Sequence, residues 1–324
     1  ACVVPGVWTL DGTERLRARP LVPLIAALRA LGGRVDCLAA EGHAPLRVRG
    51  DGLEGGRVEL DAGESSQYLS ALLMAAVRAR GEVEIVVKRL TSAPYVELTL
   101  GALGEFGPAV ERPPNHHYKV RPARMAGAEI AVEADASAAC YAGAAAALSG
   151  GRVTIRGLRP GSRQGDAGFF DLLRRMGAEV SWEGSRLVAA GGGGLLAVTV
   201  DLSTMPDQVP TLAALAPFAE GTTRITGVPH LRLKESDRLR AMSLELSRLG
   251  ATVEERPDGL EIAGIWARAV PPEEPVTVAS HDDHRIAMSL ALVGLRRPGV
   301  SVAEPGVVAK SYPEFWRDFD RLLV

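Results

Sequence analysis

Residues 207–227, DQVPTLAALAPFAEGTTRITG, join an apolar stretch of helical length to a short run rich in β-branched residues. Asp207 stands where a helix N-cap is expected, because an aspartate side chain accepts a hydrogen bond from the free N–H groups of a first turn. Gly221 marks the end of the helical stretch, and the run after it is typical of a strand. Since the helical stretch is apolar on nearly every side, we predict that it is buried.

The same pattern recurs along the chain, which indicates an internal repeat. It begins near Ser65, Asp135, Asp207 and Asp283, at intervals of about 70 to 75 residues. A second pattern alternates with it: an amphipathic helix that ends at Gly and leads into two strands, at residues 24–50, 100–122, 169–191 and 239–264. Each unit is therefore predicted as helix, strand, helix, strand, strand.

Together the two patterns give three complete units, at residues 65–121, 135–190 and 207–263, with a leading half at 13–50 and a trailing half from about 282. The leading half lacks its first helix, which reflects either an irregular end of the chain or a missing unit. We predict a mixed α/β fold in which mixed sheets pack on buried helices. A length of 324 residues predicts about two domains.

The composition restricts the partners. The 37 basic and 39 acidic residues give a net charge of −2, so we expect no nucleic-acid partner, because such a protein usually carries a strong positive field. The three cysteines, Cys2, Cys37 and Cys140, have the spacing of neither a disulfide framework nor a zinc site, which favours a reducing compartment and no metal. No apolar run reaches the roughly 20 residues of a spanning helix. We predict a cytoplasmic monomer with no membrane partner.

The starts of the predicted buried helices are candidate anion sites, because a helix N-terminus presents free N–H groups and the positive end of its dipole. Ser65, Ser66 and Gln67 precede one such helix, and Arg285 follows an Asp-His pair at another. An ordinary N-cap is the alternative for each cluster taken alone. Gln67 and Arg285 exceed what capping requires, so we keep both as candidate binding residues.

The densest cluster of charges is RLKESDR, at residues 232–238. Helical spacing predicts that Lys234 and Arg238 lie one turn apart, with Glu235 beside them, where the cations hold its carboxylate ionised or release it as a general acid. A salt-bridged helix start is the competing interpretation. Asp207 is a candidate second carboxylate at the start of another buried helix.

Two single cations complete the candidates. Arg19 precedes a proline at the start of an amphipathic helix, and a solvated loop arginine is the alternative. Lys310 lies between a predicted strand and the terminal helix, where a surface lysine is the alternative. Three other features are discounted: the glycine run 191–194 as a phosphate loop, His116 and His117 as a metal site, and Cys140 as anything but a buried hydrophobe.

Eight segments together resemble the enolpyruvyl transferase family, and they follow the order of that family over nearly the whole chain. The most specific are KESDR from Lys234, DHR from Asp283 and KSYP from Lys310. The others are LRARPL around Arg19, SSQYLSALLMAA from Ser65, SAPYVELTL from Ser92, SRQGD from Ser162 and MPDQVPTLA around Asp207.

The resemblance implies a two-domain enolpyruvyl transferase fold of repeated βαβαββ units around buried helices, with one unit incomplete. Residues 1–132 would form the domain on the shikimate-phosphate side, without its first repeat, and residues 133–324 the domain with the acid, the base and the phosphoenolpyruvate-binding residues. The implied reaction transfers the enolpyruvyl group of phosphoenolpyruvate to the 5-hydroxyl of shikimate 3-phosphate by addition and elimination. It releases phosphate, belongs to aromatic amino acid biosynthesis, and needs no metal or organic cofactor.

The resemblance also implies a role for each matched residue. Asp207 would take the proton of the attacking hydroxyl, Glu235 would protonate the methylene carbon, and Lys310 would act beside them. The implied ligands of shikimate 3-phosphate are Ser65, Ser66, Gln67, Ser92, Tyr95, Asp207 and Lys234, and those of phosphoenolpyruvate are Arg19, Gln67, Arg238, Arg285 and Lys310.

Two departures from the family pattern bear on activity. The inter-domain segment, usually GDxSSA, is ADASAA from Ala134, a change that affects a flexible hinge. The family's KSx(S/T)NR and NAGT segments, which supply a lysine and an arginine, have no match, in agreement with the incomplete unit. We therefore expect that the 324-residue chain by itself is inactive, that residues 1–132 are the less stable domain, and that an added N-terminal repeat restores turnover.

Two alternatives stay open at this stage. A UDP-N-acetylglucosamine enolpyruvyl transferase would share the fold and the donor, but the reactive loop cysteine of that branch has no counterpart here, and SSQ and KESDR favour the shikimate branch. A non-catalytic anion-binding protein is consistent with the incomplete unit. RNA-phosphate cyclases carry related repeats, and the net negative charge argues against them.

Overall fold

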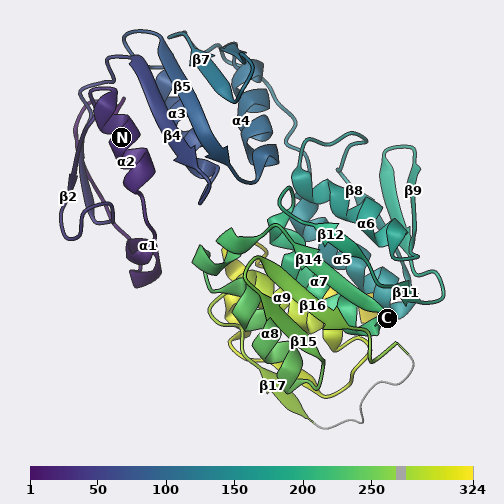
Figure 1. Ribbon diagram of the computed structural model, residues 1–324. Helices are drawn as coiled ribbons and strands as arrows, with labels where there is room; N and C mark the ends of the chain where they lie inside the picture. The colour runs from purple at the N-terminus through teal and green to yellow at the C-terminus, as the bar shows by residue number, and fades with distance from the viewer. Residues whose placement is uncertain (268–274, 324) are drawn as a thin grey trace. The chain divides into compact units, whose positions relative to one another are not determined.

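The computed structural model describes residues 1–267 and 275–323, and the chain divides into two compact units (Figure 1). Unit 1 is Ala1–Ala131 and unit 2 is Val132–Val324. Each unit has its own hydrophobic core, which includes Leu72 in unit 1 and Leu212 in unit 2. Over the described ranges, no helix is both long enough and apolar enough to cross a membrane.

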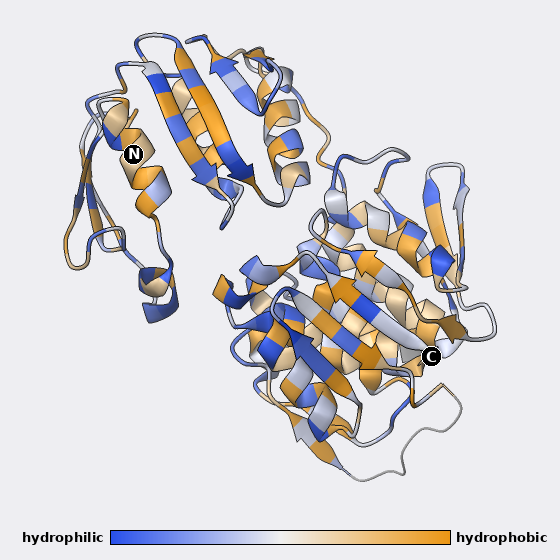
Figure 2. Ribbon diagram, in the orientation of Figure 1, coloured by the Kyte–Doolittle hydropathy of each residue, from blue (hydrophilic) through white to orange (hydrophobic). Residues whose placement is uncertain are grey.

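Unit 1 contains one antiparallel and one mixed sheet. Its elements are β1 (Val7–Leu10), α1 (Glu14–Ala18), α2 (Val22–Ala30), β2 (Arg34–Cys37), β3 (Leu46–Arg49), β4 (Gly56–Ala62), α3 (Gln67–Ala76), β5 (Val83–Leu90), α4 (Ala93–Glu105), β6 (Val110–Glu111) and β7 (His117–Val120). The antiparallel sheet has the order β1-β3-β2, and the mixed sheet has the order β4-β5-β7-β6 with β4 and β5 parallel. Hydrophobic and hydrophilic residues alternate along β4 (Figure 2), so that Val58 and Leu60 are buried while Glu59 is exposed.

Unit 2 surrounds buried helices with short sheets. Its helices are α5 (Ala136–Ser149), α6 (Phe169–Arg175), α7 (Val209–Leu215), α8 (Arg238–Arg248), α9 (His284–Val293) and α10 (Phe315–Asp320). Its 3₁₀ helices are η1 (Gly165–Gly168), η2 (Pro206–Gln208), η3 (Ala216–Phe218), η4 (Pro229–Leu233), η5 (Pro305–Lys310) and η6 (Arg321–Leu323).

The strands of unit 2 are β8 (Arg152–Arg156), β9 (Glu179–Glu183), β10 (Arg186–Ala190), β11 (Leu195–Leu196), β12 (Thr199–Asp201), β13 (Ala219–Glu220), β14 (Thr222–Thr226), β15 (Val253–Arg256), β16 (Gly259–Ala263), β17 (Val276–Val278) and β18 (Val300–Val302). They form the sheets β8-β10-β9 and β12-β14-β16-β15, and the pairs β11-β13 and β17-β18. β12 runs parallel to β14, and β17 runs parallel to β18.

The predicted mixed α/β class and the order of helix, strand, helix, strand, strand are confirmed, for example by α3, β5, α4, β6 and β7. The predicted burial of the first helix of each unit holds for α7 and α9, which pack on each other and on α5. Helix α3 differs, because Met74 is 54% exposed and Ala71 and Ala75 are half-buried. On the side of Ala71 and Ala75, residues of α2 face α3 across a pocket.

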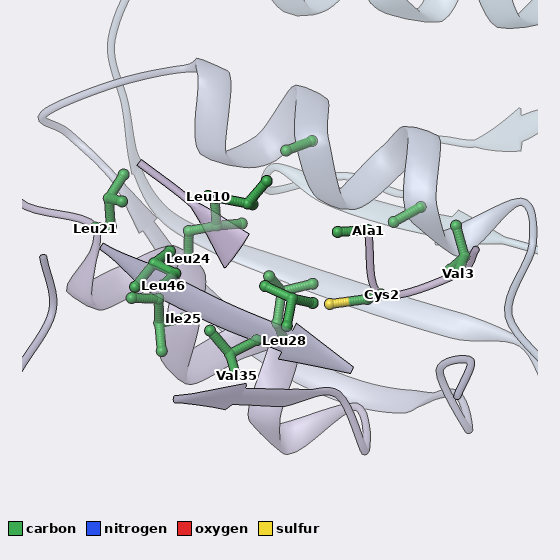
Figure 3. Close-up of a pocket in the computed structure, with 13 residues that line it drawn as sticks. Ala1, Cys2, Val3, Leu10, Leu21, Leu24, Ile25, Leu28, Val35 and Leu46 are labelled. Carbon is green, nitrogen blue, oxygen red and sulfur yellow. The ribbon is translucent and has the colours of Figure 1, made fainter. Parts of the chain in front are cut away.

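The open face of α3 continues into an apolar pocket of about 250 Å³ (Figure 3). Leu24 and Leu28 of α2, Leu46 of β3, and Ala71 and Ala75 of α3 line it. Binding sites for small polar molecules bring a few convergent polar groups into such a space. Since every residue that lines this pocket has an apolar side chain or a thiol, it does not suit a phosphorylated or carboxylated ligand.

Because α7 lies in the core, shortening one of its buried side chains is expected to cause a large loss of stability. Leu212 is fully buried, so Leu212→Ala leaves a cavity and lowers the free energy of unfolding of unit 2 by about 2 to 5 kcal/mol. Urea denaturation measures this loss. The control Leu196→Ala, at a side chain that is 52% exposed, is expected to change it by less than about 0.5 kcal/mol. Equal effects of the two substitutions would contradict the position of α7 in the core.

Candidate functional site

The polar segments of unit 2 that the sequence singled out follow strands that run parallel in pairs. Asp207 comes after β12 and Glu235 after β14, while Asp283 comes after β17 and Lys310 after β18. β12 pairs with β14, and β17 pairs with β18. Because the carboxyl ends of parallel neighbours meet at one edge of a sheet, the topology brings the two segments of each pair together.

The guanidinium of Arg238 is the centre of this cluster, and its side chain is 2% exposed. Its Nε donates to Asp283 Oδ2 at 2.8 Å, its Nη1 to Asp207 Oδ1 at 2.8 Å, and its Nη2 to Glu235 Oε2 at 2.9 Å. One planar cation thus holds carboxylates from three separate segments. Removing any partner would leave a buried charge without compensation, so the four side chains depend on one another.

Two further cations extend the cluster toward the surface. Arg285 Nη2 lies 2.9 Å from Asp207 Oδ2, and Lys310 Nζ donates to Glu235 Oε1 at 2.6 Å. Arg285 is 15% exposed and Lys310 is 55% exposed. With Arg238 these make three cations for three carboxylates, so the cluster itself has no net charge. An anionic ligand must therefore compete with Asp207 and Glu235 for the cations.

Burial and the neighbouring charges set the protonation states of the cluster. Burial favours the neutral form of Glu235, but the charge of Arg238 and the hydrogen bond from Lys310 outweigh it and lower its pKa to about 2. Burial lowers the pKa of His284 to about 4, and burial together with the charge of a nearby lysine lowers the pKa of His230 to about 4. At pH 7 Glu235 is therefore ionised and both histidines are neutral.

The helical spacing predicted for Lys234 and Arg238 is wrong. α8 begins at Arg238, because the side chain of Asp237 caps it and accepts the N–H of Arg240 at 3.0 Å. Lys234 has an extended backbone, with φ −89° and ψ −153°. The segment between them is not helical, and it lets Glu235 reach the Arg238 guanidinium from outside the helix.

Unit 1 gathers a second group of polar side chains at one edge of its mixed sheet. β4 and β5 are parallel neighbours, and their last residues, Ala62 and Leu90, are opposite each other. α3 follows β4 and α4 follows β5, so both helix N-termini lie at this edge. The predicted residues there are Ser65, Ser66 and Gln67 at the start of α3, and Ser92 and Tyr95 at the start of α4.

The two helix starts present hydroxyl groups. Ser92 has a left-handed backbone with φ 52°, and its buried Oγ has no hydrogen-bond partner among the residues that the structure describes. Ser66 is also buried, whereas Gln67 is exposed. Hydroxyl and N–H groups at the ends of two helices suit an anionic or hydroxylated ligand.

Arg19 is tied to the start of α3. It is the C-cap of α1 and precedes Pro20, whose carbonyl accepts the hydroxyl of Tyr68 at 2.5 Å. Burial raises the pKa of Tyr68 to about 12, and the charge of Arg19 acts in the opposite direction. Because Tyr68 lies in the first turn of α3, this hydrogen bond places the Arg19 segment next to the Ser66 helix start.

The sequence marked Asp283 only as part of the DHR motif at a helix start, and it did not predict that this side chain pairs with Arg238. Its side chain is fully buried and accepts the Ser236 hydroxyl at 3.1 Å and the Arg285 N–H at 2.9 Å, in addition to Arg238. An aspartate before an apolar helix is typically an N-cap, and Asp283 is one. The stronger contact is with Arg238, 45 residues away in the sequence, which no local pattern reveals.

Potential metal ligands do not gather in the part of the chain that the structure describes. Over residues 1–267 and 275–323, no group of three or more His, Cys, Asp or Glu side chains is arranged to hold an ion. The three cysteines are free, and Cys140 is buried within α5.

Comparison with known proteins gives one consistent result. The family model described as EPSP synthase (3-phosphoshikimate 1-carboxyvinyltransferase) matches residues 1–319. A 3-phosphoshikimate 1-carboxyvinyltransferase from Syntrophobacter fumaroxidans (strain DSM 10017 / MPOB) is 49% identical over 319 residues, which cover 98% of this chain and 74% of that protein. A protein of the same name from Sulfurovum sp. (strain NBC37-1) is 40% identical over 96% of this chain and 72% of its own length. A solved EPSP synthase from Acinetobacter baumannii matches with a TM-score of 0.81 and 26% identity, over 99% of this chain and 74% of the other.

The buried histidines predict that unit 2 loses stability as the pH falls from 6.5 to 4. The unfolded chain binds protons on His230 and His284 in this window, whereas the folded chain does not, because their folded pKa values are about 4. The free energy of unfolding is expected to fall by at most about 1.4 kcal/mol per pH unit for each histidine.

Urea unfolding of unit 2 at several pH values measures this slope. His284→Gln removes one titrating group, so it is expected to flatten the slope. His116→Gln, at an exposed residue of unit 1, serves as the control. A slope that is unchanged by His284→Gln would show that this histidine is protonated in the folded state.

Proposed function

The chain belongs to the EPSP synthase family, and we propose that its two polar clusters carry out the reaction of that family. This transferase reaction moves the enolpyruvyl group of phosphoenolpyruvate to the 5-hydroxyl of shikimate 3-phosphate and releases phosphate, within the shikimate pathway to the aromatic amino acids. The family model and the relatives do not favour UDP-N-acetylglucosamine as the acceptor. The observation that carries the proposal is the network of three cations and three carboxylates around Arg238.

We assign phosphoenolpyruvate to the cations of that network. Its phosphate and carboxylate groups each match the fork of a guanidinium, and Arg285 and Lys310 are the two members with exposed surface. Arg238 lies behind them and supports the same anion. In unit 1, Arg19 and Gln67 are assigned to this substrate by their positions in the motifs.

Asp207 and Glu235 are the proposed base and acid. Glu235 is ionised in this structure, because Arg238 and Lys310 outweigh burial and hold its pKa near 2, so it must take up a proton before it can give one. An anion that binds Lys310 and Arg238 withdraws their charge from Glu235 and thereby raises its pKa. Binding of phosphoenolpyruvate therefore prepares the acid that protonates its methylene carbon.

The proton transfers then balance across addition and elimination. Protonation of the methylene carbon by Glu235 makes the neighbouring carbon electrophilic, and the 5-hydroxyl oxygen adds to it while Asp207 takes the hydroxyl proton. In the second step the new methyl group returns a proton to Glu235 as the bond from carbon to the phosphate oxygen breaks, and Asp207 passes the hydroxyl proton to the departing phosphate. Lys310, beside Glu235, stabilises the negative charge that collects on the leaving phosphate.

Shikimate 3-phosphate is assigned mainly to the helix starts of unit 1. The hydroxyls at the starts of α3 and α4 and the nearby N–H groups suit its phosphate and ring hydroxyls. The buried Ser92 hydroxyl, whose Oγ lacks a partner among the described residues, is the clearest candidate to donate a hydrogen bond to this substrate. The proposed ligands are Ser65, Ser66, Gln67, Ser92 and Tyr95 of unit 1, with Lys234 and Asp207 of unit 2.

We also propose that the protein works in the cytoplasm as a monomer. The three free cysteines support a reducing compartment. Sedimentation velocity tests the oligomeric state.

Calorimetry with the two substrates is the direct test of the function. We expect binding of shikimate 3-phosphate, and of phosphoenolpyruvate in its presence, with no heat from UDP-N-acetylglucosamine at the same concentration. Binding of the UDP-sugar instead would contradict the acceptor assignment. Phosphate release from the two substrates together, measured on this chain extended by a first repeat from a relative, separates a catalyst from a protein that only binds anions.

Glu235→Gln is expected to separate binding from turnover. The amide keeps the shape of the side chain but cannot donate the proton, so phosphate release falls by about 100-fold or more while substrate affinities change by a few fold. Phosphate release is measured for the unchanged chain and for Glu235→Gln. Each is tested at its present length and with a first repeat from a relative added at its N-terminus. Unchanged turnover would remove Glu235 from the mechanism.

Arg285→Lys is expected to weaken phosphoenolpyruvate binding selectively. A lysine ammonium is a point charge and cannot replace the two parallel hydrogen bonds of a guanidinium to a carboxylate or a phosphate. Calorimetry is expected to show a clear loss for phosphoenolpyruvate and little change for shikimate 3-phosphate alone. Equal losses for both ligands would mean that Arg285 supports the fold instead.

A further inference from the structure

Glu245 is a buried carboxylate that the reaction described above does not use. It lies in the middle of α8, and its side chain is 1% exposed. Its Oε1 is 2.9 Å from His281 Nε2, while its Oε2 accepts the Ala279 N–H at 3.1 Å and Arg248 Nη1 at 2.8 Å. A buried carboxylate needs such compensation. Two of these contacts reach the turn that joins β17 to α9.

That turn has an unfavourable backbone. His281 and Asp282 both have left-handed conformations, with φ 54° and 55°, which residues other than glycine seldom adopt. Two in succession persist only where surrounding contacts hold them. Glu245 bonds both His281 and the N–H of Ala279, and Arg248 adds a bond to the Thr277 carbonyl at 3.2 Å.

The turn leads directly into the proposed active site. The residue after Asp282 is Asp283, which caps α9, bonds Arg238 and accepts the Arg285 N–H. Any relaxation of the turn therefore moves Asp283 and Arg285 relative to Arg238. α8 carries Arg238 in its first turn and Glu245 about two turns later, so one rigid helix holds both the central cation and the clamp on the turn.

We propose that Glu245 is a positioning residue that fixes Arg285 for phosphoenolpyruvate by holding the strained turn at residues 279–282. This inference rests on the proposed assignment of Arg285 to phosphoenolpyruvate. Glu245 acts through the turn and touches neither substrate nor reacting atoms in this assignment. A purely structural buried glutamate is the alternative, and it would change stability without changing the two ligand affinities differently.

The test uses four variants of the whole chain. Glu245→Ala removes the clamp, and Glu245→Gln keeps its shape in case the alanine variant does not fold. Glu254→Gln is the control, because Glu254 is an exposed strand residue paired with Arg256. The fourth variant combines Asp282→Gly with Glu245→Ala. Asp282 is exposed, and glycine adopts its left-handed conformation without strain.

Two measurements are made on each variant. Hydrogen exchange of peptides that span residues 276–290 reports the order of the turn, and calorimetry reports phosphoenolpyruvate affinity in the presence of shikimate 3-phosphate. We expect Glu245→Ala to speed exchange in this segment and to weaken phosphoenolpyruvate binding about tenfold. Shikimate 3-phosphate binding alone and the Glu254→Gln control are expected to stay within about twofold, and added Asp282→Gly is expected to recover most of the loss.

Unchanged exchange in folded Glu245→Ala or Glu245→Gln overturns the inference, as does equal weakening of both ligands. Failure of Asp282→Gly to recover affinity shows that strain in the turn is not what Glu245 restrains. Arg285→Lys separates this inference from the assignment beneath it. If that variant binds phosphoenolpyruvate normally while Glu245→Ala still speeds exchange, the assignment of Arg285 is wrong and the clamp remains only a structural contact.

Discussion

The buried guanidinium of Arg238 is the constraint on which the candidate site depends. A charge that is 2% exposed must be matched by fixed carboxylates, and here Asp207, Glu235 and Asp283 supply them. Each carboxylate belongs to a different segment, so the ion pairs of one cation fix three segments relative to one another. Arg285 and Lys310 then attach to the outer oxygens of Asp207 and Glu235, which extends the same network toward the surface.

Parallel strand pairing explains how the segments reach one another. In unit 2 the candidate residues follow β12, β14, β17 and β18, and in unit 1 they follow β4 and β5. Each copy of the repeat places a polar segment at the carboxyl end of a strand, followed by a helix N-terminus. The same arrangement occurs in both units, although their residues differ.

In this arrangement the cations of the cluster are neutralised by its own carboxylates. The cations that we assign to phosphoenolpyruvate are already paired with the proposed acid and base, so in this proposal binding and proton transfer are coupled through the same ion pairs. In the proposed mechanism a substrate anion releases Glu235 from Lys310 and Arg238, and the pKa of Glu235 rises from its value of about 2. The proposed general acid would thus stay ionised until the substrate that needs its proton is bound.

The sequence by itself determined the repeat, the mixed α/β class, most helices and strands, and the residues at the helix starts, because these follow from periodicity and capping within about 15 residues. It did not determine that Lys234 lies outside the helix of Arg238, that α3 keeps an open face, or that Asp283 bonds Arg238 and Glu245 bonds His281. Those features come from contacts between distant residues: Arg238 meets Asp283 across 45 positions and Glu245 meets His281 across 36. Burial and pairing of charge are properties of the packed chain, so only the tertiary structure could decide them.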